Sequence, residues 1–306
     1  MSTVSKTLPA RYYTDAGLFR REIDYFFFEG WICAGRADSI PQAGDYFLRE
    51  IAGESIIVVR GNSGSVEAFY NVCRHRGTRI CSAPEGSFGG RIQCPYHGWT
   101  YGLDGRLLGA PHMGPPEIFQ RSDYPLHKLQ ADLWDGHIFI NAGSHPDPLA
   151  AQLADLPARF AGWRMAELRL HKRITYDVHA NWKLIVANYN ECLHCPLLHP
   201  ALNRLTDYIG SDNEAPQPTY IGGSMGFRAG AETMSIDGAK PDFVADDAIE
   251  FWDVTNREDW HIVELSQAGI QSRAYTPGPY SSREDLLAAF DQVVIQRDSA
   301  GNSDGC

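Results

Sequence analysis

The chain has no long hydrophobic run and no excess of positive charge. Its first residues contain no apolar core of signal-peptide length, and no later stretch is long and apolar enough to span a bilayer. Its 38 acidic and 27 basic residues give a net charge of −11. Because nucleic-acid-binding domains normally carry a basic face, this balance argues against a nucleic-acid partner. We therefore expect a globular protein that binds neither nucleic acid nor membrane.

Cysteine is also scarce, with seven in 306 residues. An odd total does not suit a disulfide framework, and four of the seven lie in or beside clusters typical of metal ligands. Free or metal-bound thiols are typical of a reducing compartment, so the sequence predicts a cytoplasmic protein. The seven are Cys33, Cys73, Cys81, Cys94, Cys192, Cys195 and Cys306.

Two short cysteine–histidine pairs are the most informative feature that is present. Cys73 and His75 form the first pair, Cys94 and His97 form the second, and eighteen residues lie between them. Two thiolates and two imidazoles from two loops are a ligand set for one compact metal centre. A [2Fe–2S] cluster in which two histidines replace two cysteines on one iron needs this set, and a structural zinc site is the alternative. Strand-like residues before each pair and a glycine after each predict two facing hairpin tips, which favour the cluster.

A second candidate metal site lies at the end of a predicted helix over residues 181–195 and just beyond it. Glu191 and His194 are three residues apart and would share one face of that helix. His199 is five residues beyond His194, and a break at Pro196 would bring it back beside His194. Two histidines and one carboxylate with open positions form the facial triad of a non-haem Fe(II) oxygenase. The alternative is that both histidines are ordinary hydrogen-bonded side chains, but the cluster motif in the same chain favours the iron site.

The remaining pattern predicts an α+β protein with two domains, an all-β domain followed by a mixed one. The boundaries are 1–30 for an N-terminal helical segment, 31–145 for the cluster domain, 146–296 for the second domain and 297–306 for a disordered tail. Further helices are expected over 149–160 and 284–294, and a strand over 172–178.

These motifs give the chain a clear resemblance to a known family. It resembles the terminal oxygenase (alpha) subunits of the Rieske non-haem iron oxygenases, often described as aromatic-ring-hydroxylating dioxygenases. Cys-x-His-Arg-Gly at 73–77 and Cys-Pro-Tyr-His-Gly-Trp at 94–99 carry the resemblance, together with Glu-x-x-His-x4-His-Pro at 191–200. The resemblance implies a Rieske [2Fe–2S] cluster and a mononuclear Fe(II). It covers nearly the whole chain.

The resemblance also implies roles for individual acidic residues. The match of residues 258–272 to the family's C-terminal segment implies that Asp259 is the carboxylate ligand beside the two histidines, whereas chemistry alone leaves Glu258 and Glu264 equally eligible. Glu191 corresponds to an acidic residue that bridges two subunits, hydrogen-bonding an iron histidine and the neighbour's cluster histidine, here His97. This implies electron transfer between subunits of a homotrimer. The simpler alternative makes Glu191 itself an iron ligand.

The activity implied is O2-dependent hydroxylation or oxidative demethylation of a small organic substrate. Electrons would come from an NAD(P)H-dependent reductase, directly or through a ferredoxin, because the chain lacks a dinucleotide-binding glycine fingerprint. Glu rather than Asp at position 191 favours alkylammonium substrates, which some relatives with Glu there oxidise, over aromatic rings.

The second domain is expected to be a shortened form of the family's catalytic domain. The resemblance implies a helix-grip-like antiparallel sheet, but only 59 residues separate His199 from Asp259, fewer than in typical members. We expect a deletion near residue 240, which could expose a sheet edge. The competing hypothesis is therefore a Rieske electron-transfer protein, or an inactive remnant that has lost oxygenase activity.

Overall fold

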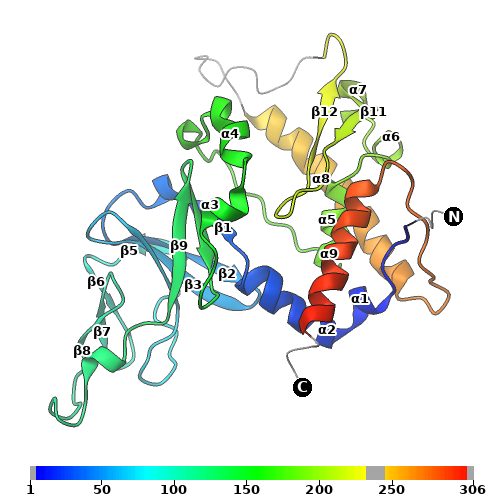
Figure 1. Cartoon of the computed structure of the whole chain (residues 1–306). Helices are drawn as coiled ribbons and strands as arrows, with labels where there is room; N and C mark the ends of the chain where they lie inside the picture. Colours follow the sequence, from blue (N-terminus) through cyan, green and yellow to red (C-terminus); the bar gives the residue numbers. More distant parts are fainter. Residues whose placement is uncertain (1–4, 232–244, 302–306) are drawn as a thin grey trace. The chain divides into compact units, whose positions relative to one another are not determined.

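The computed structural model describes residues 5–231 and 245–301 and divides the chain into two compact units (Figure 1). The first contains residues 22–168, and the second contains the residues up to 21 and from 169 onward. The predicted boundaries at 30 and 145 are therefore displaced. Side-chain contacts explain the displacement, since Asn141 donates to the carbonyl of Glu29 at 2.6 Å and Gln152 accepts from the amide of Trp31 at 3.2 Å.

The first unit is built on an antiparallel sheet with the order β1-β10-β9-β4-β3-β2-β5. Its strands are β1 (Ile32–Arg36), β2 (Asp45–Ile51), β3 (Glu54–Arg60), β4 (Val66–Tyr70), β5 (Glu85–Ser87), β9 (Lys128–Trp134) and β10 (His137–Asn141). A second sheet has the order β6-β7-β8, formed by β6 (Arg91–Gln93), β7 (Thr100–Gly102) and β8 (Leu107–Gly109). The prediction of an all-β first domain is confirmed.

Alternate residues of β3 enter two different cores. Ile57 and Val59 belong to the core that also contains both cluster-motif cysteines, whereas Ile56 and Val58 belong to the core on the other face. Successive side chains on a strand point to opposite faces, so a continuous branched run predicts a strand covered on both sides. The core between β3 and the small sheet therefore supports the cluster loops.

Short helices complete this unit. A π-helical segment covers Ile23–Phe28, and 3₁₀ turns cover Ala37–Ser39, Arg121–Asp123, Ala161–Trp163 and Met165–Glu167. The helix predicted over 149–160 is present as α3 (Leu149–Leu153) and α4 (Leu156–Phe160). The break lies at Ala154, whose φ of +50° is incompatible with a continuous right-handed helix.

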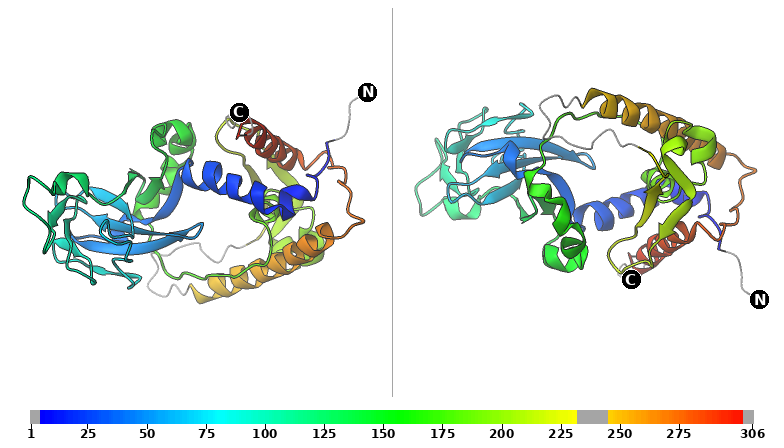
Figure 2. Two further views of the ribbon diagram at one scale, coloured as in Figure 1. Left: turned by 90° about the horizontal axis from the view of Figure 1, so that it is seen from below. Right: turned by 90° about the horizontal axis from the view of Figure 1, so that it is seen from above.

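The second unit mixes helices with an antiparallel β11–β12 hairpin, and α8 and α9 pass on opposite sides of that hairpin (Figure 2). Its elements are α1 (Arg11–Thr14), α2 (Ala16–Glu22), α5 (Trp182–Tyr189), α6 (Cys195–Leu198), α7 (Leu202–Leu205), β11 (Thr206–Asn213), β12 (Gly223–Phe227), α8 (Asp246–Ile270) and α9 (Asp285–Gly301). The last residue of α2 belongs to the first unit. Among the described residues, no helix has both the length and the apolar character needed to cross a membrane.

Two predictions for this unit are wrong. No strand forms over 172–178, because the segment is held by α8 instead: Tyr176 donates to Asp253 at 2.6 Å, and the amide of His179 donates to Glu264 at 2.9 Å. The tail is not disordered from residue 297, since α9 continues to Gly301. Residues 302–306 and the deletion expected near residue 240 lie outside the described residues.

An ion pair explains the extra length of α9. Asp298 is 9% exposed, and its carboxylate lies 2.6 Å from the guanidinium of Arg21. The charge-assisted hydrogen bond from Arg21 holds Asp298 in place near the end of the helix. The polar composition of the tail therefore did not mean that the helix ends before residue 297.

Candidate metal centres

The two cluster-motif loops have the same backbone frame. In each loop the cysteine amide donates to the carbonyl five residues later, and the glycine four residues later donates back to the cysteine carbonyl, at distances of 2.8 to 3.1 Å. These residues are Cys73 with Gly77 and Cys94 with Gly98, and the two glycines have φ of +73° and +70°. Left-handed φ values of this kind are readily adopted only by glycine. The glycine after each pair is therefore part of the loop geometry.

The four predicted cluster residues lie together in the first unit. Cys73 and Cys94 are 3% and 2% exposed, and the ring centroids of His75 and His97 are 4.7 Å apart. The ring of His75 stacks on Trp99 with centroids 4.9 Å apart, and its buried Nδ1 has no hydrogen-bond partner among the described residues. A buried polar atom without a partner is costly. This nitrogen therefore fits a metal ligand better than a structural histidine.

The surroundings of the cysteines also fit a bound metal. Burial raises the pKa of the Cys94 thiol, although the backbone amide of Tyr96 donates toward its sulfur and opposes the rise. Coordination to a metal deprotonates a thiol outright and removes that penalty. The hydroxyl of Tyr101 lies 3.3 Å from the sulfur of Cys73, close enough to donate a hydrogen bond to a thiolate.

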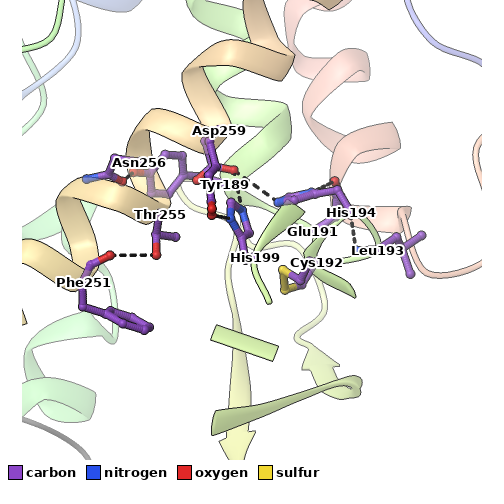
Figure 3. Close-up of polar contacts among 12 residues, drawn as sticks. Tyr189, Glu191, Cys192, Leu193, His194, His199, Phe251, Thr255, Asn256 and Asp259 are labelled. Atoms are coloured by element: carbon purple, nitrogen blue, oxygen red, sulfur yellow. Dashed lines mark hydrogen bonds and ion pairs between the residues drawn. A yellow bond between two sulfur atoms is a disulfide. The ribbon is translucent and has the colours of Figure 1, made fainter. Parts of the chain in front are cut away.

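The second site brings His194, His199 and Asp259 together (Figure 3). The Nε2 of His199 lies 2.8 Å from Oδ1 of Asp259, and the Nε2 of His194 lies 3.4 Å from the same oxygen. Asp259 is 6% exposed and projects from α8, while the two histidines flank α6. Three ligand atoms of the type found in a two-histidine, one-carboxylate iron site thus converge on one point.

Each histidine also has a carboxylate on its other nitrogen. Nδ1 of His194 lies 2.5 Å from Oε1 of Glu191, and Nδ1 of His199 lies 2.7 Å from Oε2 of Glu258. Such partners fix the tautomer, so that Nε2 is free to bind a metal. The resemblance implied a hydrogen bond between Glu191 and one of the two histidines without specifying which, and the contact of Glu258 with His199 was missed. The contact of Glu258 could have been suspected from the sequence, because Glu258 directly precedes the candidate ligand Asp259.

The electrostatics of the site also favour a cation. Burial alone would lower the pKa of His194, but its hydrogen bonds with Asp259 and Glu191 outweigh burial and raise the pKa to about 9. Burial opposes ionisation of Asp259 as well, yet His194 and His199 lower its pKa. Metal binding displaces protons from ligand atoms. A divalent cation bound between the two histidines and Asp259 can therefore replace the proton that they hold.

The local chain path differs from the predicted one. The helix predicted over 181–195 begins at its Asn181 cap, whose side chain accepts from the amide of Lys183 at 3.1 Å, but it ends at Tyr189. A turn, not a helix face, therefore brings Glu191 to His194. Pro196 does not break a helix; it occupies the first turn of α6, where its missing N–H is tolerated.

Cys192 and Cys195 form a disulfide, so the prediction of free or metal-bound thiols is wrong for these two, whereas Cys73, Cys81 and Cys94 are free. Cys192 and Cys195 are bonded, with their Cα atoms 5.1 Å apart, a separation that the turn between α5 and α6 creates. The sulfur of Cys195 and ligand nitrogens of His194 and His199 all lie within 4.8 Å of one another. As a disulfide sulfur, however, it offers no thiolate to a metal.

A cavity of about 320 Å³ opens beside the second site. Its lining includes the three candidate ligands and the large side chains of Tyr189, Met225, Trp252 and Leu286. Tyr189 and Trp252 are 58% and 53% exposed. The cavity has the volume of a small-molecule site.

Two protein families match the chain. The Rieske [2Fe–2S] domain matches residues 30–129, and the catalytic domain of ring-hydroxylating alpha subunits matches residues 165–240 and 225–299. The chain is 30% identical to the glycine betaine monooxygenase oxygenase subunit of Pseudomonas aeruginosa, over 90% of this chain and 85% of that protein. That alignment has 368 positions, more than the 306 residues here, so the relative contains residues with no counterpart in this chain.

Other relatives have related activities. The carnitine monooxygenase oxygenase subunit of Escherichia coli is 39% identical over 64% of this chain and 53% of that protein. Among solved structures, the quaternary ammonium Rieske monooxygenase CntA in complex with L-carnitine superposes with a TM-score of 0.82, at 27% identity over 96% of each chain. The chain therefore belongs to the Rieske-type ring-hydroxylating oxygenases, as a terminal oxygenase (alpha) subunit whose cofactors are a Rieske [2Fe–2S] cluster and a mononuclear iron.

Proposed function

We propose that this oxygenase subunit monooxygenates a small alkylammonium compound, by hydroxylation or by oxidative demethylation. The observation that carries the proposal is the aromatic lining of the cavity beside the His194, His199 and Asp259 cluster. Tyr189 and Trp252 both line this cavity, and both side chains are more than half exposed. Aromatic faces attract cations, and quaternary ammonium groups are a recurrent ligand of such sites. The named relatives that oxidise glycine betaine and carnitine support the same substrate class.

We assign the cofactors to seven residues. Cys73, His75, Cys94 and His97 would hold the cluster, and His194, His199 and Asp259 would hold the iron. When bound, the two centres supply single-electron transfer and O2 activation. The competing hypothesis is an electron carrier whose shortened second domain has lost catalysis. The convergence of His194, His199 and Asp259 favours the oxygenase over that carrier.

The role proposed for Glu191 is a bridge between subunits of a homotrimer. Within its own chain its carboxylate accepts hydrogen bonds from Nδ1 of His194 and from the amide of Leu193. A carboxylate offers about four lone-pair sites, so a third donor can be accepted. We propose that this donor is the cluster histidine of a neighbouring subunit, His97 in that copy. The electron would then travel from one subunit's cluster to the next subunit's iron.

A reductase is needed to supply electrons to a Rieske oxygenase. We propose that here it is NAD(P)H-dependent and acts directly or through a ferredoxin. We also retain the proposal of a cytoplasmic location, which cell fractionation tests. Its basis in cysteine usage is weaker than expected because Cys192 and Cys195 form a disulfide.

The substrate class can be tested with the reconstituted holoprotein. A prereduced cluster should be reoxidised by O2 at least about tenfold faster with a trimethylammonium compound than without substrate, and one oxygen atom from 18O2 should appear in the product. Acceleration by aromatic hydrocarbons alone would replace the alkylammonium proposal. No acceleration by either class would favour the electron carrier.

A pair of tryptophan variants tests the pocket itself. Trp252→Leu removes the aromatic face and should raise KM for an alkylammonium substrate about tenfold, with a smaller effect on kcat. Trp163→Leu is the matched control, because Trp163 is 69% exposed and lies in the first unit. Equal KM values in the two variants would contradict the aromatic-pocket proposal.

A further inference from the structure

His199 is held at both ring nitrogens by neighbouring residues of α8. Its Nε2 lies 2.8 Å from Oδ1 of Asp259, and its Nδ1 lies 2.7 Å from Oε2 of Glu258. Consecutive residues of an α-helix point about 100° apart, so the two carboxylates can reach opposite edges of one imidazole. The helix therefore fixes both the position and the rotation of this ring.

The side chain of Glu258 is not part of the buried core. Its side chain is 33% exposed, whereas that of His199 is 2% exposed. Its hydrogen bond to Nδ1 of His199 is the contact that turns the carboxylate toward the site. Helix α8 continues through this position with its buried face formed by other residues, including Asp259 and Val263. A side chain of this kind can be changed without removing core packing.

We propose that Glu258 is a positioning residue of the iron centre, which keeps His199 protonated at Nδ1 and turned with Nε2 toward the metal. This inference rests on the proposed assignment of His199 and Asp259 as iron ligands. A carboxylate on the remote nitrogen of a ligand imidazole fixes the tautomer and increases the basicity of the ligand nitrogen. His194 has the same arrangement with Glu191, so each iron histidine has its own carboxylate.

The two carboxylates differ in what else they can do. Glu191 follows α5 in the chain and is the residue proposed to contact a neighbouring subunit. Glu258 comes from α8, fifty-nine residues after His199, and touches the other histidine. Loss of Glu258 should therefore change iron binding and the iron's spectroscopic properties without altering electron delivery between subunits.

The test compares Glu258→Ala and Glu258→Gln in the full chain with its cluster in place. Alanine removes the hydrogen bond, and the affinity for Fe(II), measured by competition with a chelator, should fall about 10- to 100-fold. Glutamine keeps an oxygen acceptor of the same reach, so it should recover most of that affinity. The EPR spectrum of the ferrous nitric oxide complex should nevertheless change, because the charge on the acceptor is lost.

Glu250→Gln on the exposed surface of the same helix is the matched control and should equal the parent in every measurement. The cluster absorption and the thermal unfolding of each variant report whether the fold is intact. Parent-like Fe(II) affinity and an unchanged EPR spectrum in Glu258→Ala would overturn the inference. Asp259→Ala separates the two levels: if it also retains iron, the proposed iron site fails, whereas if it alone loses iron, only the role of Glu258 fails.

Discussion

Asp291 accepts a hydrogen bond from the hydroxyl of Tyr280 at 2.8 Å, in a part of the second unit where Asp291 is 5% exposed. Burial raises the pKa of this carboxyl to about 6, although the bond from Tyr280 and the charge of Lys183 oppose the rise. Burial and the adjacent Asp291 raise the pKa of Tyr280 as well. The pair joins α9 to the segment before it. Keeping the buried Asp291 ionised costs free energy, and this cost depends on pH.

This cost predicts the pH dependence of stability. An unperturbed aspartate has a pKa of 3.8, so between about pH 4 and pH 6 the folded state binds more protons at Asp291 than the unfolded state does. Stability from this group is therefore present below about pH 4 and is lost as pH rises through about 6. Asp291→Asn should flatten the curve of unfolding free energy against pH by up to about 3 kcal/mol. Denaturant unfolding at several pH values checks this, and an unchanged curve would show that another group titrates.

The turn at Gly105 gives a prediction about packing beneath the cluster loops. Gly105 has a φ of +84°, and a Cβ added there would lie 2.5 Å from Cε1 of the buried ring of Phe69. Gly64 has the same φ of +84° but open space around it. Gly105→Ala should therefore be about 1–3 kcal/mol less stable than Gly64→Ala, since both share the backbone strain and only one has the clash. Equal stability of the two variants in denaturant unfolding would contradict this reading.

Tyr101 gives a prediction about the reduction potential of the cluster. Its hydroxyl lies 3.3 Å from the sulfur of Cys73, and hydrogen bonds to cluster sulfurs help to set the potential. Tyr101→Phe removes a donor that stabilises the more negative reduced state, so the midpoint should fall by about 40–80 mV, equivalent to about 1–2 kcal/mol. Tyr46→Phe is the control, because Tyr46 accepts from Cys81, which is outside the cluster. Voltammetry should show no comparable fall there.

The proposed bridge by Glu191 predicts a kinetic effect without metal loss. Glu191→Gln keeps the size of the side chain but replaces a charge-assisted hydrogen bond with a weaker neutral one. Both metals should remain, while reoxidation of the prereduced cluster in the presence of substrate and O2 should slow by about tenfold, or about 1.4 kcal/mol in the barrier. Stopped-flow absorption measures the rate, and sedimentation confirms that the variant assembles as the parent does. An unaltered rate in an intact assembly would reject the bridge.

Much of the cluster domain could be predicted because its signals are local. Each cysteine–histidine pair lies within four residues, and the Asp-Gly pair at 104–105, between β7 and β8, is a turn signal of the same local kind. Glycines that follow the two pairs are likewise adjacent in sequence. No long-range information was needed to expect two similar loops.

Helix α8 is different, because it was not predicted from the sequence. Its buried positions are Thr255, Asp259, Val263, Gln267 and Ile270, spaced as one helix face but with only two apolar members. Hydrophobic periodicity therefore does not reveal this helix. The hydrogen bond between Glu258 and His199 depends on long-range packing of α8 against the α6 region. The disulfide between Cys192 and Cys195 depends on a turn at a place where a helix was predicted. The expected strand over 172–178 was wrong for the same reason, because its polar contacts with α8 have no signature in the segment itself.

The residues proposed to hold the two metal centres lie in different units, so the losses of the two centres should be separable. Cys94→Ala removes a proposed cluster ligand and should abolish the cluster absorption and EPR signals, while Asp259→Ala removes a proposed iron ligand and should abolish bound mononuclear iron and turnover. Each change should leave the other centre's signal at the level of the parent, because no ligand is shared. Cys33→Ala and His261→Ala are matched controls outside both centres, and both should retain the parent iron content. Iron analysis together with the visible spectrum distinguishes loss of the cluster from loss of the mononuclear iron in each of the four variants. A Cys94→Ala protein with a full cluster signal would refute the cluster assignment. An Asp259→Ala protein that still turns over substrate would refute the iron-site assignment.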